Sequence, residues 1–201
     1  KKIPFNIKST IDFQSLLSSF GNSSSLDDIT FINSPQIEAK GELHLGNADL
    51  RTDRDTKLQV ELIGTVKCGS FISKEILFEE AYADFSYKKN KWYVRNLTLE
   101  HASGTANGNV LWDTLSDIQF DTEIKMDPTV FVPFFKQPPK FLTHLKFEEN
   151  PAIHLSLKGK GSTTNPINWK AKGYFALGPC HYQKTPLTAA TGKIQIDKKE
   201  I

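Results

Sequence analysis

The sequence predicts a mostly β protein, built from an antiparallel, meandering sheet with short helices. Three observations support this fold class. Segments in which apolar and polar residues alternate recur along most of the chain, short clusters of Gly, Asn, Asp and Pro separate them, and the order of segments restarts near residue 116. Because alternation with a period of two places side chains on opposite faces, each predicted strand has one apolar and one polar face.

The clearest part of this pattern predicts three consecutive strands on short turns. Alternation begins at Ala81 and is interrupted by the Lys- and Asn-rich segment 88–91. A second alternating run begins at Trp92, and its phase slips near Asn96, as it does at a β-bulge. The Gly-containing segment 104–108 then leads into a third strand. An antiparallel meander with one apolar face is the simplest arrangement of these strands.

Further strands and a few helical segments follow from the same patterns. Asp12 can cap a short helix within 12–20, and prolines in the apolar segment 129–147 restrict it to one or two short helices. The other predicted strands are 2–8, 36–45, 58–67, 71–76, 118–126, 151–157 and 169–177.

The restart near residue 116 predicts an internal repeat. A shift of 109 residues superposes Gly64 on Gly173 and Phe85 on Ile194, and a shift of 116 superposes Pro35 on Pro151. We therefore expect a first repeat over residues 1–115 and a second over 116–201, truncated at its C-terminal end. On this interpretation the chain is an excerpt of a longer repetitive protein.

Composition excludes several classes of protein. With 25 basic and 23 acidic side chains and a net charge of +2, the chain lacks the electrostatic signature of nucleic-acid binding. Two cysteines, Cys68 and Cys180, are too few for a disulfide-built scaffold, and a disulfide between them is not expected. No apolar run approaches the roughly 20 residues of a membrane-spanning helix.

No constellation of residues predicts catalysis or metal binding. The five histidines are scattered, and none is at metal-ligand spacing from Cys, Asp or Glu. Asp53 and Asp55 lack the glycine and terminal glutamate of a calcium loop. Because nucleophile and phosphate-binding motifs are also absent, we expect neither an enzyme nor a cofactor.

The apolar face is the remaining candidate site. In a closed sandwich its side chains are core, whereas in an open, curved sheet they line a groove that suits acyl chains, and the sequence leaves both alternatives open. Small residues recur on this face, which would leave room in a groove or ease bending of the sheet. The groove candidates are Ile37, Ala39, Leu43, Leu45, Leu58, Val60, Leu62, Val66, Ala81, Ala83, Phe85, Tyr87, Trp92, Val94, Val110, Trp112, Ile153, Leu155, Leu157, Trp169, Ala171, Phe175, Ile194 and Ile196.

The segment FEEAYADFSYKKNKWYVRNLTLEHASGTANGNVLWD resembles the recurring element of the AsmA-like superfamily, the AsmA, TamB and YhdP type of bridge-like lipid-transfer protein. An apolar strand, a basic turn and a second strand precede Gly104 and Gly108 in the order typical of that element. The short helical segments before Pro35 and Pro151 are similar as well. The resemblance spans nearly the whole chain and involves no catalytic motif.

The resemblance implies a long, curved and twisted sheet that forms an open groove or an incomplete barrel. Such proteins are anchored at the inner membrane, here through regions outside this chain, and cross the periplasm. The implied partners are a phospholipid or other acyl lipid and further repeats of the parent chain, with no nucleic acid. The implied function is to shield acyl chains during phospholipid transport to the outer membrane.

Two other functions remain open from the sequence. One is a structural or assembly module of the cell envelope, with a packed β core and a strand edge that binds a partner. The other is a carbohydrate-binding sandwich, which requires Trp92, Trp112 and Trp169 to be exposed and coplanar. The alternation places these tryptophans on the apolar face instead.

Overall fold

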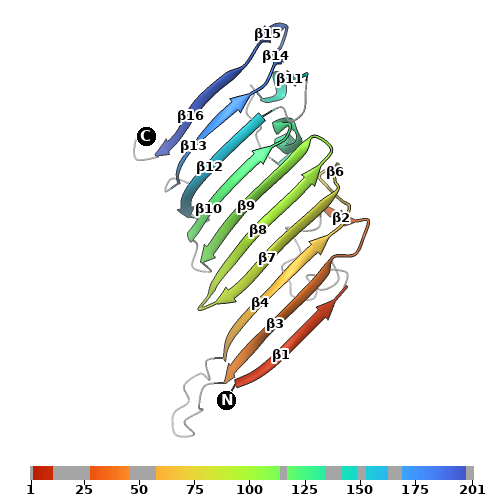
Figure 1. Ribbon diagram of the computed structural model, residues 1–201, viewed down its shortest axis with the longest axis vertical. Coiled ribbons are helices and arrows are strands. Elements are labelled where there is room, and N and C mark those ends of the chain that lie inside the picture. The colour runs from red at the N-terminus through yellow and green to blue at the C-terminus, as the bar shows by residue number, and fades with distance from the viewer. Residues whose placement is uncertain are drawn as a thin grey trace.

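The computed structural model describes residues 2–10, 28–45, 58–113, 117–134, 142–148, 153–162 and 169–197. Its main element is one antiparallel sheet of 10 strands in the order β1-β3-β4-β7-β8-β9-β10-β12-β13-β16 (Figure 1). Strands β1 and β16 lie at opposite ends of this order, so the sheet is open and not closed into a barrel. The predicted mostly β, antiparallel fold is confirmed.

The strands of the large sheet agree closely with the alternating segments of the sequence. They are β1 (Lys2–Ser9), β3 (Gln36–Leu45), β4 (Leu58–Cys68), β7 (Glu80–Lys88), β8 (Lys91–His101), β9 (Gly104–Asp113), β10 (Asp117–Lys125), β12 (Ile153–Ser162), β13 (Lys170–Leu177) and β16 (Ala190–Asp197). The predicted slip near Asn96 is a β-bulge, because the register between β8 and β9 shifts between Val94 and Leu97 and Asn96 has a φ of 50°.

Two small sheets lie near one end of the long strands (Figure 1). The first consists of β2 (Ile29–Phe31), β5 (Phe71–Ser73) and β6 (Ile76–Phe78), and the second of β11 (Leu145–Phe147), β14 (Cys180–Tyr182) and β15 (Thr185–Leu187). The sequence predicted a single short strand over residues 71–76, but this segment forms the β5–β6 hairpin. Lys74 and Glu75 form its turn, with φ angles of 51° and 68°.

The predicted helical segments are short where the structure describes them. The segment with Pro128 and Pro133 folds as the 3₁₀ helix η2 (Pro128–Phe134), and a second 3₁₀ helix, η3, is a single turn (Leu142–His144). Asp127 caps the first turn of η2, since its Oδ1 accepts a hydrogen bond of 2.8 Å from the backbone N–H of Thr129. The helix predicted within residues 12–20 lies outside the described residues.

The order of elements recurs along the chain. A shift of 116 residues carries β2 onto β11, and a shift of 109 carries β5 onto β14 and β6 onto β15. The strand order β1-β3-β4-β7 corresponds in the same way to β10-β12-β13-β16. Lys74 and Gln183, which the shift of 109 relates, have similar positive φ angles of 51° and 56°. The β8–β9 hairpin joins the two sets of strands into one sheet.

A small core lies where the strands end and the first small sheet begins. Phe78 is only 3% exposed, and its ring centroid lies 5.2 Å from that of Phe71, 5.9 Å from that of His101 and 6.4 Å from that of Phe134 in η2. Met126, at the end of β10, is fully buried. Aromatic side chains of the small sheet and of η2 thus close over one end of the long strands.

Both cysteines are buried and free. Cys68 ends β4, and Cys180 lies in β14 of the second small sheet. Burial raises the pKa of the Cys68 thiol above its ordinary value, because desolvation disfavours the thiolate. These side chains therefore act as small apolar groups in the packing.

Candidate functional site: the apolar face of the sheet

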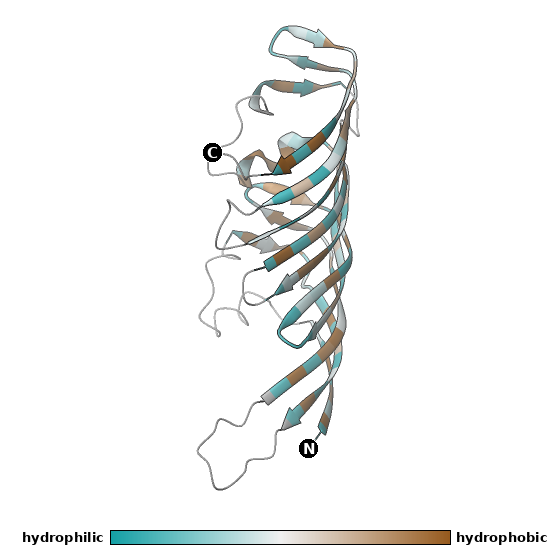
Figure 2. Ribbon diagram, turned by 90° about the vertical axis from the view of Figure 1, so that its left-hand side faces the viewer, coloured by the Kyte–Doolittle hydropathy of each residue, from teal (hydrophilic) through white to brown (hydrophobic). Residues whose placement is uncertain are grey.

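A continuous row of apolar or glycine residues crosses the whole sheet. Its members are directly opposite one another in the register of successive strands, so all of them belong to one face. The row consists of Ile7, Ala39, Gly64, Phe85, Val94, Val110, Phe120, Gly159, Ala171 and Ile196. We call this side of the sheet the apolar face and the other side the polar face. Alternating brown and teal bands along the strands in Figure 2 show the two sets of residues.

The structure brings the predicted groove residues together on the apolar face. Register pairs connect them across strands, for example Leu62 to Tyr87, Trp92 to Trp112 and Leu155 to Phe175. For Leu45 and Leu58 the structure describes only the backbone positions, which are opposite each other in β3 and β4. Trp169 precedes β13 and reaches the same face, where its ring lies 5.7 Å from that of Phe120.

Several residues of this face were not among the predicted groove residues. They follow the same alternation of apolar and polar residues within the predicted strands, so the same pattern could have identified them. These residues are Ile3, Phe5, Ile7, Leu97, Leu99, Ala106, Ile118, Phe120, Ile124 and Leu177.

Aromatic rings on this face lie over glycines of the neighbouring strand. A Cβ atom on Gly64 would lie 2.7 Å from Cζ of Phe85, and one on Gly159 would lie 2.6 Å from Cζ of Phe120. Phe5 over Gly41, Trp169 over Gly161 and Phe175 over Gly192 repeat the arrangement. From the sequence, small residues on this face are expected to leave room in a groove or to ease bending of the sheet. At these five glycines the neighbouring ring already occupies the room, as in aromatic rescue of strand glycines.

Gly192→Ala is expected to destabilise the protein by about 1–3 kcal/mol, the usual cost of overpacking. The three nearest atoms to a Cβ at this position all belong to the ring of Phe175, at 2.5–3.4 Å. The double variant Gly192→Ala/Phe175→Leu should therefore show a smaller cost for the alanine than the single variant does. Urea unfolding of the four members of this cycle measures the coupling, and equal costs in both backgrounds would contradict the packing.

The large side chains of the apolar face are at least partly exposed. Trp112 is 46% exposed and Ile196 is 41% exposed, and among the apolar-face residues of the large sheet whose side chains the structure describes, only Ala39, Cys68, Ala83 and Ala171 are buried. Within the described ranges no second sheet of comparable size is present to cover this face, since the two small sheets contain three short strands each. The closed-sandwich alternative therefore does not describe this part of the chain.

One end of the apolar face is covered. His101 continues the alternation of Leu97 and Leu99 on β8, so its ring belongs to this face. Phe78 of the first small sheet packs edge-on against His101 at 5.9 Å, and Phe134 of η2 packs against Phe78. The small sheet and η2 thus bound the apolar face at the strand ends.

Charged side chains on the polar face form cross-strand ion pairs. Lys8 pairs with Glu38 at 2.6 Å, and Lys91 pairs with Asp113 at 3.3 Å. A depression of about 710 Å³ also lies on this side, lined in part by Lys40, Glu61 and Ile63, and the sequence analysis did not predict it. Exposed pairs of this kind stabilise a fold by at most about 1 kcal/mol each, so they mainly keep this face hydrated.

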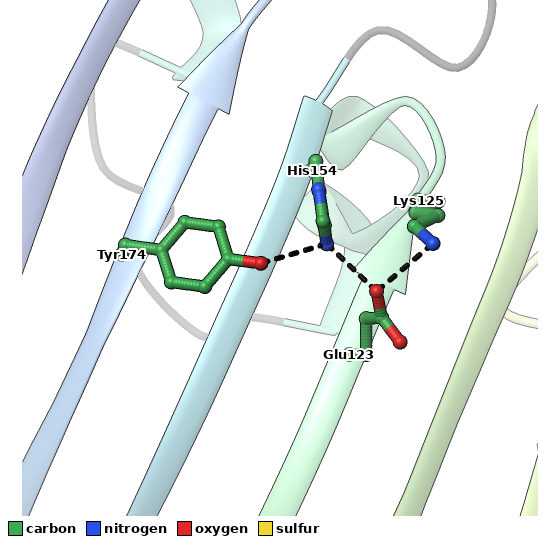
Figure 3. A network of polar contacts seen from close by, with 4 residues as sticks. All are labelled: Glu123, Lys125, His154 and Tyr174. Carbon is green, nitrogen blue, oxygen red and sulfur yellow. Dashed lines mark hydrogen bonds and ion pairs between the residues drawn. The ribbon is translucent and has the colours of Figure 1, made fainter.

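A four-residue network lies near the end of β10, β12 and β13 on the polar face (Figure 3). Oε1 of Glu123 lies 2.9 Å from Nζ of Lys125 and 2.7 Å from Nε2 of His154, whose ring nitrogen is 3.3 Å from the Tyr174 hydroxyl. Hydrogen bonds from Lys125 and then His154 lower the pKa of Glu123 below its ordinary 4.5. All four side chains are partly or fully exposed, as expected of a surface network.

An NMR titration should place the pKa of the Glu123 carboxyl below 4.5, and Lys125→Met should move it back towards that value. Because the folded-state pKa is lower than the unfolded one, the network contributes stability above the unfolded pKa. That contribution is lost as the pH falls through the folded pKa. An unchanged midpoint in the Lys125→Met variant would contradict the assigned cause.

Together the fold and this face define an open, amphipathic β-sheet protein, with one apolar face and one polar face. Comparisons with protein-family models, with curated proteins and with solved structures found no match. In the part of the chain that the structure covers, no three His, Cys, Asp or Glu residues are placed to hold a metal ion. Among the described helices, none has the length and apolar character needed to cross a bilayer.

Proposed function

We propose that this protein shields the acyl chains of a phospholipid or other lipid on its apolar face, as a segment of an AsmA-like lipid-transfer protein of the cell envelope. The observation that supports the proposal is the apolar row that crosses all ten strands from Ile7 to Ile196. Apolar side chains form a protein core only where another layer of the protein covers them. A partly exposed apolar surface of this length instead suits a lipid or protein partner.

The arrangement of residues favours extended acyl chains over compact ligands. Rings that lie over glycines, such as Phe85 over Gly64, keep the face low and continuous along the sheet. Acyl chains need no specific hydrogen bonds, so a surface without converging polar groups is sufficient to hold them. Each buried CH₂ group would contribute about 0.8 kcal/mol.

Lipid analysis of protein purified without detergent tests the proposal. Native mass spectrometry should show adducts of lipid mass, and organic extraction should recover acyl lipid in proportion to protein. A clean apo mass, with no lipid taken up after incubation with phospholipid vesicles, would overturn it.

A structural or assembly module of the envelope is the second candidate, and one observation favours it. Among the described strands, β1 and β16 each have a single neighbour in the large sheet. Edge strands present unpaired backbone groups that a partner strand can bind. If this second function is correct, a charged substitution on the apolar face leaves binding of the partner strand unchanged. If the protein shields lipid, the same substitution abolishes lipid binding.

A further inference from the structure

Four lysines are placed side by side on the polar face of β12 and β13. Lys158 is directly opposite Lys172, and Lys160 is directly opposite Lys170. Cβ atoms of opposite residues are about 5 Å apart, and like charges in such positions destabilise a sheet. Residues two apart on a strand are about 7 Å apart. The four side chains, which we call the lysine quartet, therefore begin from a rectangle of about 5 by 7 Å.

The neighbouring strands extend the quartet into two rows of four residues. One row is Asp121, Lys158, Lys172 and Gln195, and the other is Gln119, Lys160, Lys170 and Asp197. The rows run in opposite senses, so the set has an approximate twofold axis between β12 and β13. With four lysines and two aspartates, its net charge is +2.

Only half of the quartet is neutralised. Lys158 Nζ lies 3.0 Å from Asp121 Oδ2, and Lys170 Nζ lies 3.6 Å from Asp197 Oδ1. Within the described residues, neither Lys160 nor Lys172 forms an ion pair, and each is flanked by a neutral glutamine.

Another pair of opposite lysines on this face shows the difference. Lys88 and Lys91 are also directly opposite each other, but Lys88 pairs with Glu61 at 3.0 Å and Lys91 pairs with Asp113 at 3.3 Å. These two lysines and their two carboxylates sum to zero charge. The two rows of the quartet have a carboxylate at one end only.

We propose that the lysine quartet binds a phosphate group, either free phosphate or pyrophosphate or the headgroup of an anionic lipid. A depression of about 370 Å³ is lined by all four lysines together with Gln119, Gln195 and Asp197. Its two unpaired ammonium groups and two amides offer charge and donors to an anion with three or more acceptor oxygens. A carboxylate, with two oxygens and one charge, would satisfy fewer of these donors.

The site is independent of the lipid-shielding proposal, because the quartet lies on the opposite face of the sheet from the apolar row. Calorimetric titration with pyrophosphate tests it directly. The Gln119→Glu/Gln195→Glu variant keeps every lysine but gives each row a second carboxylate, as in the Lys88 and Lys91 row. Gln36→Glu/Gln59→Glu makes the same change of charge on the polar face of β3 and β4, and is the matched control.

Pyrophosphate should bind the unmodified protein saturably. Its affinity for Gln119→Glu/Gln195→Glu should be at least tenfold lower, and its affinity for the control variant should lie within twofold of that for the unmodified protein. The melting temperature of Gln119→Glu/Gln195→Glu should be no lower than that of the unmodified protein, because the added carboxylates relieve repulsion between the lysines. This measurement distinguishes loss of binding from loss of folding. Absence of saturable binding, or equal weakening in both variants, would overturn the proposal.

Vesicles distinguish the two sources of phosphate. Retention by vesicles that contain phosphatidylglycerol, lost in Gln119→Glu/Gln195→Glu, would assign the quartet to lipid headgroups. Pyrophosphate binding without vesicle retention would assign it to soluble phosphate. Both results support a phosphate site.

Discussion

Val110→Asp is expected to reduce copurifying acyl lipid at least tenfold, whereas Leu111→Asp is expected to leave it unchanged. Val110 lies in the middle of the apolar row, opposite Val94 and Phe120. Leu111 is the next residue of β9 and lies on the polar face, opposite Tyr93 and Gln119. A carboxylate on the apolar face cannot be desolvated by an acyl chain without a large free-energy cost.

Aspartate suits this comparison better than lysine, because a lysine side chain can bend its ammonium group towards water and keep its methylene groups on the apolar surface. Circular dichroism and thermal melting establish whether both variants are folded. Ile196→Asp offers a second site on edge strand β16, where the side chain is 41% exposed and the cost in stability is smaller. Equal lipid content in Val110→Asp and Leu111→Asp, whether high or low, would contradict shielding by the apolar face.

Phe78→Ala is expected to lower the free energy of unfolding by about 3–5 kcal/mol, the usual cost of removing a buried aromatic ring. The ring is 3% exposed and contacts Phe71, His101 and Phe134, so its removal leaves a cavity between the first small sheet, β8 and η2. Single domains have about 5–15 kcal/mol of stability in total, which makes this a large fraction.

Leu77→Ala is the matched control for Phe78→Ala. Leu77 is the preceding residue of β6, and its side chain is 51% exposed, so we expect a change within about 1 kcal/mol. Urea denaturation followed by tryptophan fluorescence measures both values. Similar losses for the two variants would mean that the small sheet does not hold the strand ends together.

Strand positions and faces could be predicted from the sequence because alternation depends only on neighbours along the chain. The bulge at Asn96 was predictable for the same reason, since one extra residue reverses the phase of apolar positions. The alternation assigns Tyr87 and Trp92, for example, to the apolar face, and the two residues are directly opposite each other in β7 and β8. Their rings lie 4.9 Å apart in the structure.

Features that depend on register could not be predicted in this way. The sequence does not show that Phe120 lies beside Gly159, or that Lys158 lies opposite Lys172, because these contacts depend on which strands are neighbours and in what register. The two small sheets were missed because strands of three residues are too short for a periodic pattern. Whether another layer covers the apolar face is likewise a property of the whole fold.

The recurring order of strands makes the length of the sheet a simple function of the number of units. From β1 to its counterpart β10, the sheet advances by six strands. At about 4.8 Å per strand, one period adds roughly 29 Å, close to the thickness of a bilayer's hydrocarbon core. In repeat proteins each unit contacts mainly its neighbours, so duplication or deletion of one unit would change the span of such a sheet in steps of this size.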